Sequence, residues 1–274
     1  MDLIKLTADS RLYNFHSHTQ FCDGRAAMSA FAKYAVDMKF AHYGFSPHSP
    51  VPFWSPCNMS QADVKPYLRE VERLNKKYAD SGTRFYASME IDYLGSDWGP
   101  AIPYFAEMPL DYRIGSVHFI PTRSGEMVDI DGSFSDFKVR MATKFDNDIR
   151  YVVETFYRQS SQMLRDGGFD IVGHFDKIGH NASSFQPGIE KEQWYVDLVN
   201  GLIDLIIEKG VIVELNTKAW AQHGRMFPGE QWLDRLCQAG VPVVVNSDAH
   251  YPDLINASRY DGFDMLRKHG FLLS

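Results

Sequence analysis

Strand-like and helix-like segments alternate along almost the whole chain, and this alternation limits the folds that it can adopt. Short runs rich in Val, Ile, Phe and Tyr are typical of strands, and longer stretches with helical spacing separate them. Such a chain builds a parallel sheet, because each helix carries it back to the start of the next strand. The predicted strands are YNFHS near residue 15, HYGFS at 42–46, RFYASMEI at 84–91, YRIGSVHF at 112–119, DIVGH at 170–174, VIVELN at 211–216 and VPVVVNSD at 241–248.

Seven such units favour a closed or nearly closed α/β barrel, and an open, doubly wound sheet is the alternative. Ser60 and Asp63 fit a capping box at the start of a helix that runs to about Ala79. Residues 95–110 and 120–145 are interpreted as loop-rich insertions, so residues 1–274 are expected to form a single domain. The other predicted helices are 28–39, 145–165, 191–209, 229–239 and 261–269.

Composition narrows the classes of function. Hydrophobic residues make up 45% of the 274 residues, and the net charge is −7 with His neutral. An acidic chain argues against an electrostatic nucleic-acid binder, which normally presents a basic face. Three dispersed cysteines form no disulfide framework, and no apolar run reaches the ~18 residues of a membrane span. The start, MDLIKLTADS, has no apolar signal core. We expect a cytoplasmic protein without membrane or nucleic-acid partners, in an oligomeric state that the sequence leaves open.

The segment NFHSHTQFCDG, residues 14–24, carries two histidines and a carboxylate in close succession. Alternation along a strand places His16 and His18 on the same face, and Asp23 follows on the next loop. In a parallel barrel the C-terminal ends of the strands meet at one face, so ligand-type residues at those ends should converge. Such residues follow the other predicted strands: His48, Glu90, His118, His174, Glu214 with Asn216, and Asp248 with His250.

Imidazole and carboxylate groups together suit zinc, manganese or iron better than calcium or magnesium. A carboxylate such as Glu90 can bridge two ions, and two or three close ions fit hydrolysis of a phosphate ester by an activated water. Each residue alone also has an ordinary interpretation as a hydrogen-bonded histidine, an ion-pair partner or a turn cap. Their recurrence at six of the seven strand ends favours a metal site. The histidines outside the pattern are interpreted as structural or surface residues: His42, His180, His223 and His269.

Six short motifs, taken in order, resemble the PHP (polymerase and histidinol phosphatase) family of metallo-phosphoesterases, and its histidinol-phosphatase branch in particular. They are FHSHTQFCDG, GFSPHSP, SMEID, GSVHF, IVGHFD and VNSDAH. The resemblance runs from about residue 13 to the end and implies a distorted (β/α)7 barrel of the TIM type with a trinuclear site. The chain departs from the family in having Ser46-Pro47-His48 where Ser-Asp-His is frequent, and in the sequence GHFDKIGH.

The resemblance also implies roles for residues. A metal-activated hydroxide attacks phosphorus, and Glu90, Asp248 and His250 are the expected catalytic residues. One of the latter two is expected to assist the leaving alkoxide. The expected metal ligands are His16, His18, Glu90 and Asp248 for one ion, Glu90, His118 and His174 for a second, and Asp23, His48 and His250 for a third.

Contacts to the substrate are expected from basic residues after the sixth strand. Lys218 and Arg225 are the candidates for phosphate, with Arg158 as a weaker one. Glu214 is charged yet ends an apolar strand, so it is expected either to bind a cationic group of the substrate or to orient a metal ligand.

The resemblance implies a phosphatase that converts L-histidinol phosphate to L-histidinol in histidine biosynthesis, with zinc, manganese or iron. One alternative is a related enzyme for nucleotides, sugar phosphates or phosphotyrosine. Another is a metal-dependent amidohydrolase, although such enzymes commonly have a bridging lysine at the place of Glu90. A non-catalytic metal-binding barrel is the third.

Overall fold

The computed structural model describes residues 1–272 and contains two parallel sheets and one antiparallel hairpin. The first sheet has the order β1-β2-β3, the second has the order β10-β9-β8-β5-β4, and β6 pairs with β7. The strands are β1 Tyr13–Asn14, β2 His42–Phe45, β3 Arg84–Ala87, β4 Glu90–Asp92, β5 Ile114–Ser116, β6 Phe119–Pro121, β7 Met127–Asp129, β8 Ile171–Val172, β9 Ile212–Asn216 and β10 Val243–Asn246.

The two parallel sheets join into a ring of seven strand positions. β3 and β4 belong to one chain segment, which pairs with β2 along its first part and with β5 along its second. An isolated parallel bridge between His48 and Glu90 continues the ladder from one sheet to the other. A second parallel bridge, between Ser17 and Ala249, connects the chain beyond β1 to the chain beyond β10. The arrangement is the distorted (β/α)7 barrel expected from the sequence.

The distortion is concentrated between β1 and β10, where side chains replace ladder hydrogen bonds. The backbone N–H of Phe15 donates to Asn246 Oδ1 at 2.8 Å, and that of Ser247 donates to Asn14 Oδ1 at 3.0 Å. The N–H of Val245 donates to the hydroxyl of Tyr13 at 3.0 Å. Buried backbone groups therefore stay paired although the strands do not form a regular ladder here.

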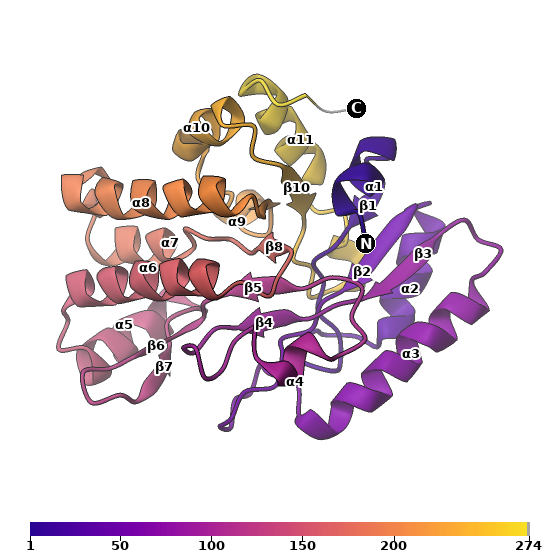
Figure 1. The fold of residues 1–274 in the computed structure, drawn as a ribbon, viewed down its shortest axis with the longest axis horizontal. Helices are drawn as coiled ribbons and strands as arrows, with labels where there is room; N and C mark the ends of the chain where they lie inside the picture. The colour runs from indigo at the N-terminus through magenta and orange to yellow at the C-terminus, as the bar shows by residue number, and fades with distance from the viewer. Residues whose placement is uncertain (273–274) are drawn as a thin grey trace.

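Helices surround the strands (Figure 1). Ordinary end signals set their bounds: Asp148 caps α6 by accepting from Tyr151 N, and α8 ends at Gly210, which has a left-handed conformation at φ 64°. The α-helices are α1 Leu3–Asp9, α2 Met28–Asp37, α3 Val64–Lys77, α4 Pro103–Ala106, α5 Phe134–Lys144, α6 Ile149–Asp166, α7 Ile178–Phe185, α8 Gln193–Lys209, α9 Trp220–His223, α10 Leu233–Gln238 and α11 Arg259–Lys268. Short 3₁₀ turns are η1 Gln61–Asp63, η2 Ile189–Lys191, η3 Glu230–Trp232 and η4 Pro252–Leu254.

Most of the expected elements are confirmed. The helices α1 and α7 were not expected, and two further details differ. The segment 120–145 is not loop-rich: it contains the β6–β7 hairpin and the eleven-residue helix α5. Ser60 does not cap a backbone N–H; its hydroxyl donates to the side chain of Asp63 at 2.7 Å, and a 3₁₀ turn precedes α3. The hairpin was missed because its three-residue strands are too short to show a period.

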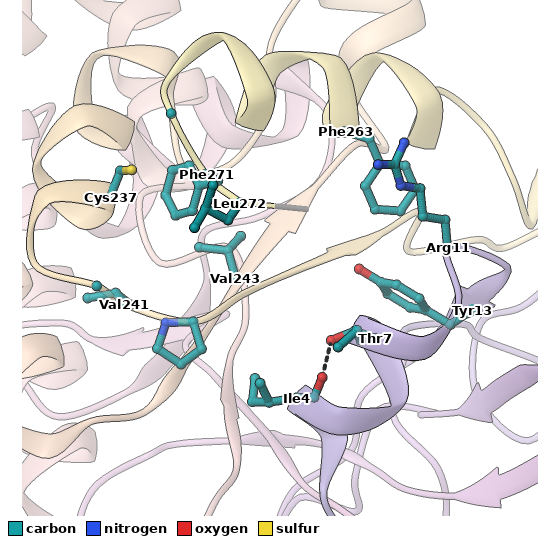
Figure 2. Close-up of a pocket in the computed structure, with 14 residues that line it drawn as sticks. Ile4, Thr7, Arg11, Tyr13, Cys237, Val241, Val243, Phe263, Phe271 and Leu272 are labelled. Carbon is teal, nitrogen blue, oxygen red and sulfur yellow. Dashed lines mark hydrogen bonds between the residues drawn. The ribbon is translucent and has the colours of Figure 1, made fainter. Parts of the chain in front are cut away.

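The end of the barrel at the start of the strands carries a mainly apolar cavity of about 650 Å³ (Figure 2). Ile4 of α1, Val243 of β10 and Phe263 of α11 line it. The ligand-type side chains lie at the other end of the same strands and do not line this cavity. Among the described residues, no helix is long and apolar enough to cross a membrane.

Candidate metal centre

The nine expected metal ligands all lie beyond the C-terminal ends of the barrel strands or at the start of β4, and they converge. Six of them have at most 5% of their surface exposed: His16, His18, Glu90, His118, His174 and Asp248. The side chains of the other three, Asp23, His48 and His250, are 20%, 12% and 15% exposed and face the opening. The convergence predicted from the sequence is therefore present in the structure.

Two of these residues have unusual backbone conformations, which set the directions of their side chains. His174 follows β8 with φ 24°, and Asp248 follows β10 with φ 48°. Positive φ is unfavourable for residues with a side chain, and such strain collects at functional sites. Asp23 reaches the cluster through a tight loop: a Cβ at Gly24 would lie 2.3 Å from the backbone of His18, so only glycine allows this approach.

Glu90 lies at the centre of the cluster, and its two oxygens face different histidines. Oε1 is 2.8 Å from Nε2 of His174 and 3.4 Å from Nε2 of His118. Oε2 is 3.2 Å from Nε2 of His16 and 3.5 Å from Nε2 of His18. A carboxylate in this position can contribute one oxygen to each of two neighbouring ions.

Ligand atoms gather in three overlapping groups whose members lie within 4.8 Å of one another. The groups are His16, His18 and Asp248; His48, Glu90 and His118; and Asp23, His18, His48 and His250. They agree with the three expected ligand sets in outline, with His18 and His48 each near two groups. His174 joins the second group through its 2.8 Å approach to Glu90.

Several of these atoms have no other partner. Nε2 of His16, Nε2 of His18 and Oδ1 of Asp23 are buried and make no hydrogen bond among the described residues. Buried polar atoms normally find partners, since leaving one unpaired is costly. Unpaired nitrogen and oxygen atoms gathered in one buried cluster fit cations among them, so the residues present suit divalent metal ions.

Hydrogen bonds on the far side of the rings fix their orientation. His16 Nδ1 lies 2.6 Å from Glu214 Oε1, and His118 Nδ1 lies 2.6 Å from Asp92 Oδ1. Nδ1 of His250 lies 3.0 Å from the carbonyl oxygen of Asp248. A histidine whose Nδ1–H donates to an oxygen presents a lone pair at Nε2, which is the usual arrangement in metal sites.

The charges of the cluster also suit cations. Burial alone would raise the pKa of Glu90, but His16 and His118 hold it well below its usual value. Burial would likewise raise the pKa of Asp248, but Lys218 and His16 hold it well below the usual range. Burial lowers the pKa of His18 strongly. Ionised carboxylates and a neutral imidazole are the forms that bind metals. Against the effect of burial, neighbouring carboxylates raise the pKa of His16 and of His118 well above the ordinary value, so a metal ion would displace a proton from each of these two rings.

The expected substrate residues fall into two groups. Lys218 lines the cleft, with Nζ 3.4 Å from Asp248 Oδ1 and 3.3 Å from His250 Nε2. Arg225 instead makes a two-fold ion pair with Glu190, at 2.7 and 2.8 Å.

Arg158 is exposed on α6 and donates to Thr155 of the same helix. Neither Arg225 nor Arg158 lines the cleft, so the structure gives no support to phosphate contacts from these two arginines.

Glu214 is fully buried beneath the cluster. Its oxygens accept from the side chains of Asn216 and Asn246 and from the backbone N–H of His174, besides contacting His16. With these partners it has no exposed oxygen for a substrate cation. The structure therefore corrects the first expectation for Glu214 and agrees with the second, in which it orients a metal ligand.

Sequence reasoning missed several residues of the site, among them Asp92 and Lys177. Asp92 contacts Nδ1 of His118 and orients its ring. The sequence indicated this position, because Asp92 follows Glu90 by two residues and so lies on the same face of the strand. Lys177 also lines the cleft, with Nζ 2.6 Å from Asp131 Oδ2. Its place in GHFDKIGH, three residues after His174, was the available indication.

The fold and the site together define a class: an α/β barrel with a buried cluster of histidines and carboxylates at the C-terminal ends of its strands, suited to several divalent metal ions. The sequence matches the family model for the PHP domain over residues 14–218. This chain belongs to the PHP family.

Several proteins that are similar to this chain are named as histidinol phosphatases. A Deinococcus radiodurans protein named "Probable histidinol-phosphatase" is 24% identical over 275 residues, which cover 94% of each chain. Among solved structures, hisK of Listeria monocytogenes has a TM-score of 0.78 at 18% identity, covering 91% of this chain and 99% of that one. Histidinol phosphate phosphatase of Lactococcus lactis, complexed with zinc, L-histidinol and phosphate, has a TM-score of 0.70 at 16% identity, covering 95% and 94%.

Proposed function

We propose that this protein is a metal-dependent phosphatase that hydrolyses L-histidinol phosphate to L-histidinol and phosphate. The observation that carries the proposal is the position of Glu90, whose two oxygens face two different histidine groups in a buried cluster. Such a bridging carboxylate fits adjacent metal ions, and adjacent ions fit phosphate-ester hydrolysis. The names of the relatives support the choice of substrate.

Three divalent ions, of zinc, manganese or iron, fit the donor set. When bound, they supply Lewis acidity and lower the pKa of a coordinated water. The proposed ligands are His16, His18, Glu90 and Asp248 for one ion, Glu90, His118 and His174 for a second, and Asp23, His48 and His250 for a third.

Two lysines extend the site toward the substrate. Lys177 and Lys218 both line the cleft that contains Glu90 and His250. Each offers an ammonium group to phosphate oxygens, and these cations offset the negative charge that develops during phosphoryl transfer. Lys177 takes the place that the sequence had suggested for Arg225.

His250, a proposed ligand of the third ion, is also proposed to lie beside the leaving alkoxide. Its side chain is 15% exposed at the mouth of the cleft, and Nε2 lies 3.3 Å from Lys218 Nζ and 3.3 Å from Asp23 Oδ2. Water can reach this edge of the site, so the proton for the leaving alkoxide is proposed to come from a water molecule there. Asp248 contacts both Lys218 and His18, so it links the lysine to the proposed metal ligands.

Residues 1–274 are proposed to form one domain, because the barrel ring uses strands from β1 to β10. We place the reaction in the cytoplasm, where the three cysteines, free in the structure, stay reduced.

The test is release of inorganic phosphate from L-histidinol phosphate by the metal-loaded protein, beside a panel of sugar phosphates, nucleotides and phosphotyrosine peptides. We expect a preference for L-histidinol phosphate, lost after chelation and restored by divalent metal. Preference for another ester would overturn the substrate but keep the phosphatase. No phosphate release from any ester, together with hydrolysis of amides, would favour an amidohydrolase.

A further inference from the structure

A second cavity adjoins the metal cleft. The cleft has a volume of about 210 Å³ and the adjoining cavity about 230 Å³. One extended ligand can therefore occupy both, with its phosphate at the metal cluster and the remainder in the second cavity. The residues that line both are Asp131, Gly132, Lys177, Lys218 and Asp248.

The shared wall is charged. Lys177 and Lys218 lie there, beside the carboxylates of Asp131 and Asp248. The lysines suit a phosphate that reaches into the cleft. The side chain of Asp131 is 32% exposed, so it can also accept from an ammonium group near that phosphate.

The far wall of the adjoining cavity is aromatic. The rings of His180 and His223 lie with centroids 4.6 Å apart at 52°, and Phe227 lies edge-on to His180 at 6.4 Å. Burial lowers the pKa of His180, and His223 and Arg225 lower it further, so its imidazole is neutral. A neutral imidazole offers one donor and one acceptor nitrogen to a ligand.

Asn181 gives an independent indication that a ligand binds here. Its side chain is 4% exposed and lines the adjoining cavity. Nδ2 donates to the carbonyl of Ile130 at 3.4 Å, whereas Oδ1 is buried without a hydrogen-bond partner among the described residues. A buried amide oxygen without a donor is unfavourable, so an N–H group of a ligand at this place would complete its hydrogen bonding.

We propose that the adjoining cavity binds the heteroaromatic ring of the leaving group, and that His180, His223 and Asn181 hydrogen-bond its ring nitrogens and set substrate specificity. This inference rests on the proposed function. In L-histidinol phosphate the amine lies close to the ester oxygen, which matches Asp131 at the shared wall, and the imidazole lies one methylene further away. A ligand with a second anionic group would fit less well, because the cations of this cavity lie at the shared wall.

Direct binding tests the cavity without turnover. L-Histidinol is titrated by calorimetry, in the presence of inorganic phosphate, into metal-loaded wild-type protein and into His180→Phe and Asn181→Leu. His180→Phe keeps the ring volume but removes both nitrogens, and we expect at least about tenfold weaker binding. Asn181→Leu removes the unpaired oxygen, and we expect weaker binding with no loss in Tm. His269→Gln, which lies outside both cavities, is the matched control.

Kinetics test the same residues during turnover. The ratio of kcat/KM for L-histidinol phosphate to kcat/KM for O-phosphoethanolamine, which has the amine but no ring, is expected to fall about tenfold or more in both variants. Equal losses on the two esters, or unchanged histidinol binding, would overturn the ring site while leaving the phosphatase in place. If wild-type protein binds L-histidinol through these residues but does not hydrolyse its phosphate, the proposed function fails and the ring site stands. If it does neither, both are wrong.

Discussion

Nδ1 of His16 lies 2.6 Å from Oε1 of Glu214, and both side chains are fully buried. Glu214 belongs to β9, and His16 belongs to the segment after β1. The contact therefore joins residues 198 positions apart in the sequence. It fixes which nitrogen of His16 faces Glu90. A buried carboxylate with protein partners on both of its oxygens therefore controls how the cluster presents the Nε2 atom of His16.

Glu214→Gln should weaken metal binding without removing a ligand. The amide keeps the shape of the side chain but loses the charge that orients His16, and such changes typically cost about 10–100-fold in metal affinity. Competition with a chromophoric chelator measures this. Glu208→Gln, at a side chain 66% exposed on α8, is the control and should bind metal normally. Unchanged affinity in Glu214→Gln would mean that the contact with His16 is only structural.

Glu90→Ala should abolish activity and reduce the metal content. Its oxygens face two groups of histidines, so one substitution removes a ligand from two ions. We expect a loss in kcat of at least about 1,000-fold, or about 4 kcal/mol of barrier. Elemental analysis of the dialysed protein checks the metal content beside phosphate release. Full metal content with normal turnover would refute the bridging role.

Arg225→Ala should act on stability and not mainly on phosphate binding. Arg225 is 17% exposed and ion-paired with Glu190, and its removal leaves Glu190 and the buried Asp176 without their cation. We expect a loss of about 1–3 kcal/mol in urea unfolding. Arg158→Ala, at an exposed arginine, should change the free energy of unfolding by less than about 0.5 kcal/mol. Normal stability with a strongly raised KM in Arg225→Ala would restore Arg225 as a phosphate contact.

The stability contributed by His269 should decrease as the pH rises. The hydrogen bond to Asp234, at 2.6 Å, and a second one to Glu230 raise the pKa of His269. A raised pKa in the folded state means that the contribution is complete below the ordinary histidine value of about 6.5 and is lost as the pH passes the folded value. His269→Gln should therefore reduce the free energy of unfolding more at pH 5.5 than at pH 9, by about 0.5 kcal/mol because both carboxylates are largely exposed.

Asp234→Asn provides the control for this pH dependence. It removes the main partner, so His269→Gln made in that background should have a much smaller pH-dependent effect. The same dependence in both backgrounds would show that another group titrates.

The alternation of strand and helix patterns predicted a parallel sheet, because parallel strands need helical crossovers, and the seven units favoured a barrel over an open sheet. The resemblance to the PHP family then indicated the distorted (β/α)7 barrel. The same rule predicted that His16, Glu90 and Asp248 meet, since residues at strand ends share one face whatever their separation in sequence. Topology alone brings these residues together, and topology follows from local patterns.

Only the tertiary structure decided which charged residues face the cleft. Lys177 and Arg225 both lie in irregular segments after strands, and no periodicity fixes the direction of a side chain there. In the folded chain Arg225 forms an ion pair with Glu190, whereas Lys177 lines the cleft. His180 and His223, which looked like ordinary histidines, face each other because α7 and α9 lie side by side there. The sequence thus determined the barrel and the convergence of the proposed metal ligands, which depend on strand order. The surroundings of the substrate depend on the paths of the loops, and contacts between distant segments set those paths.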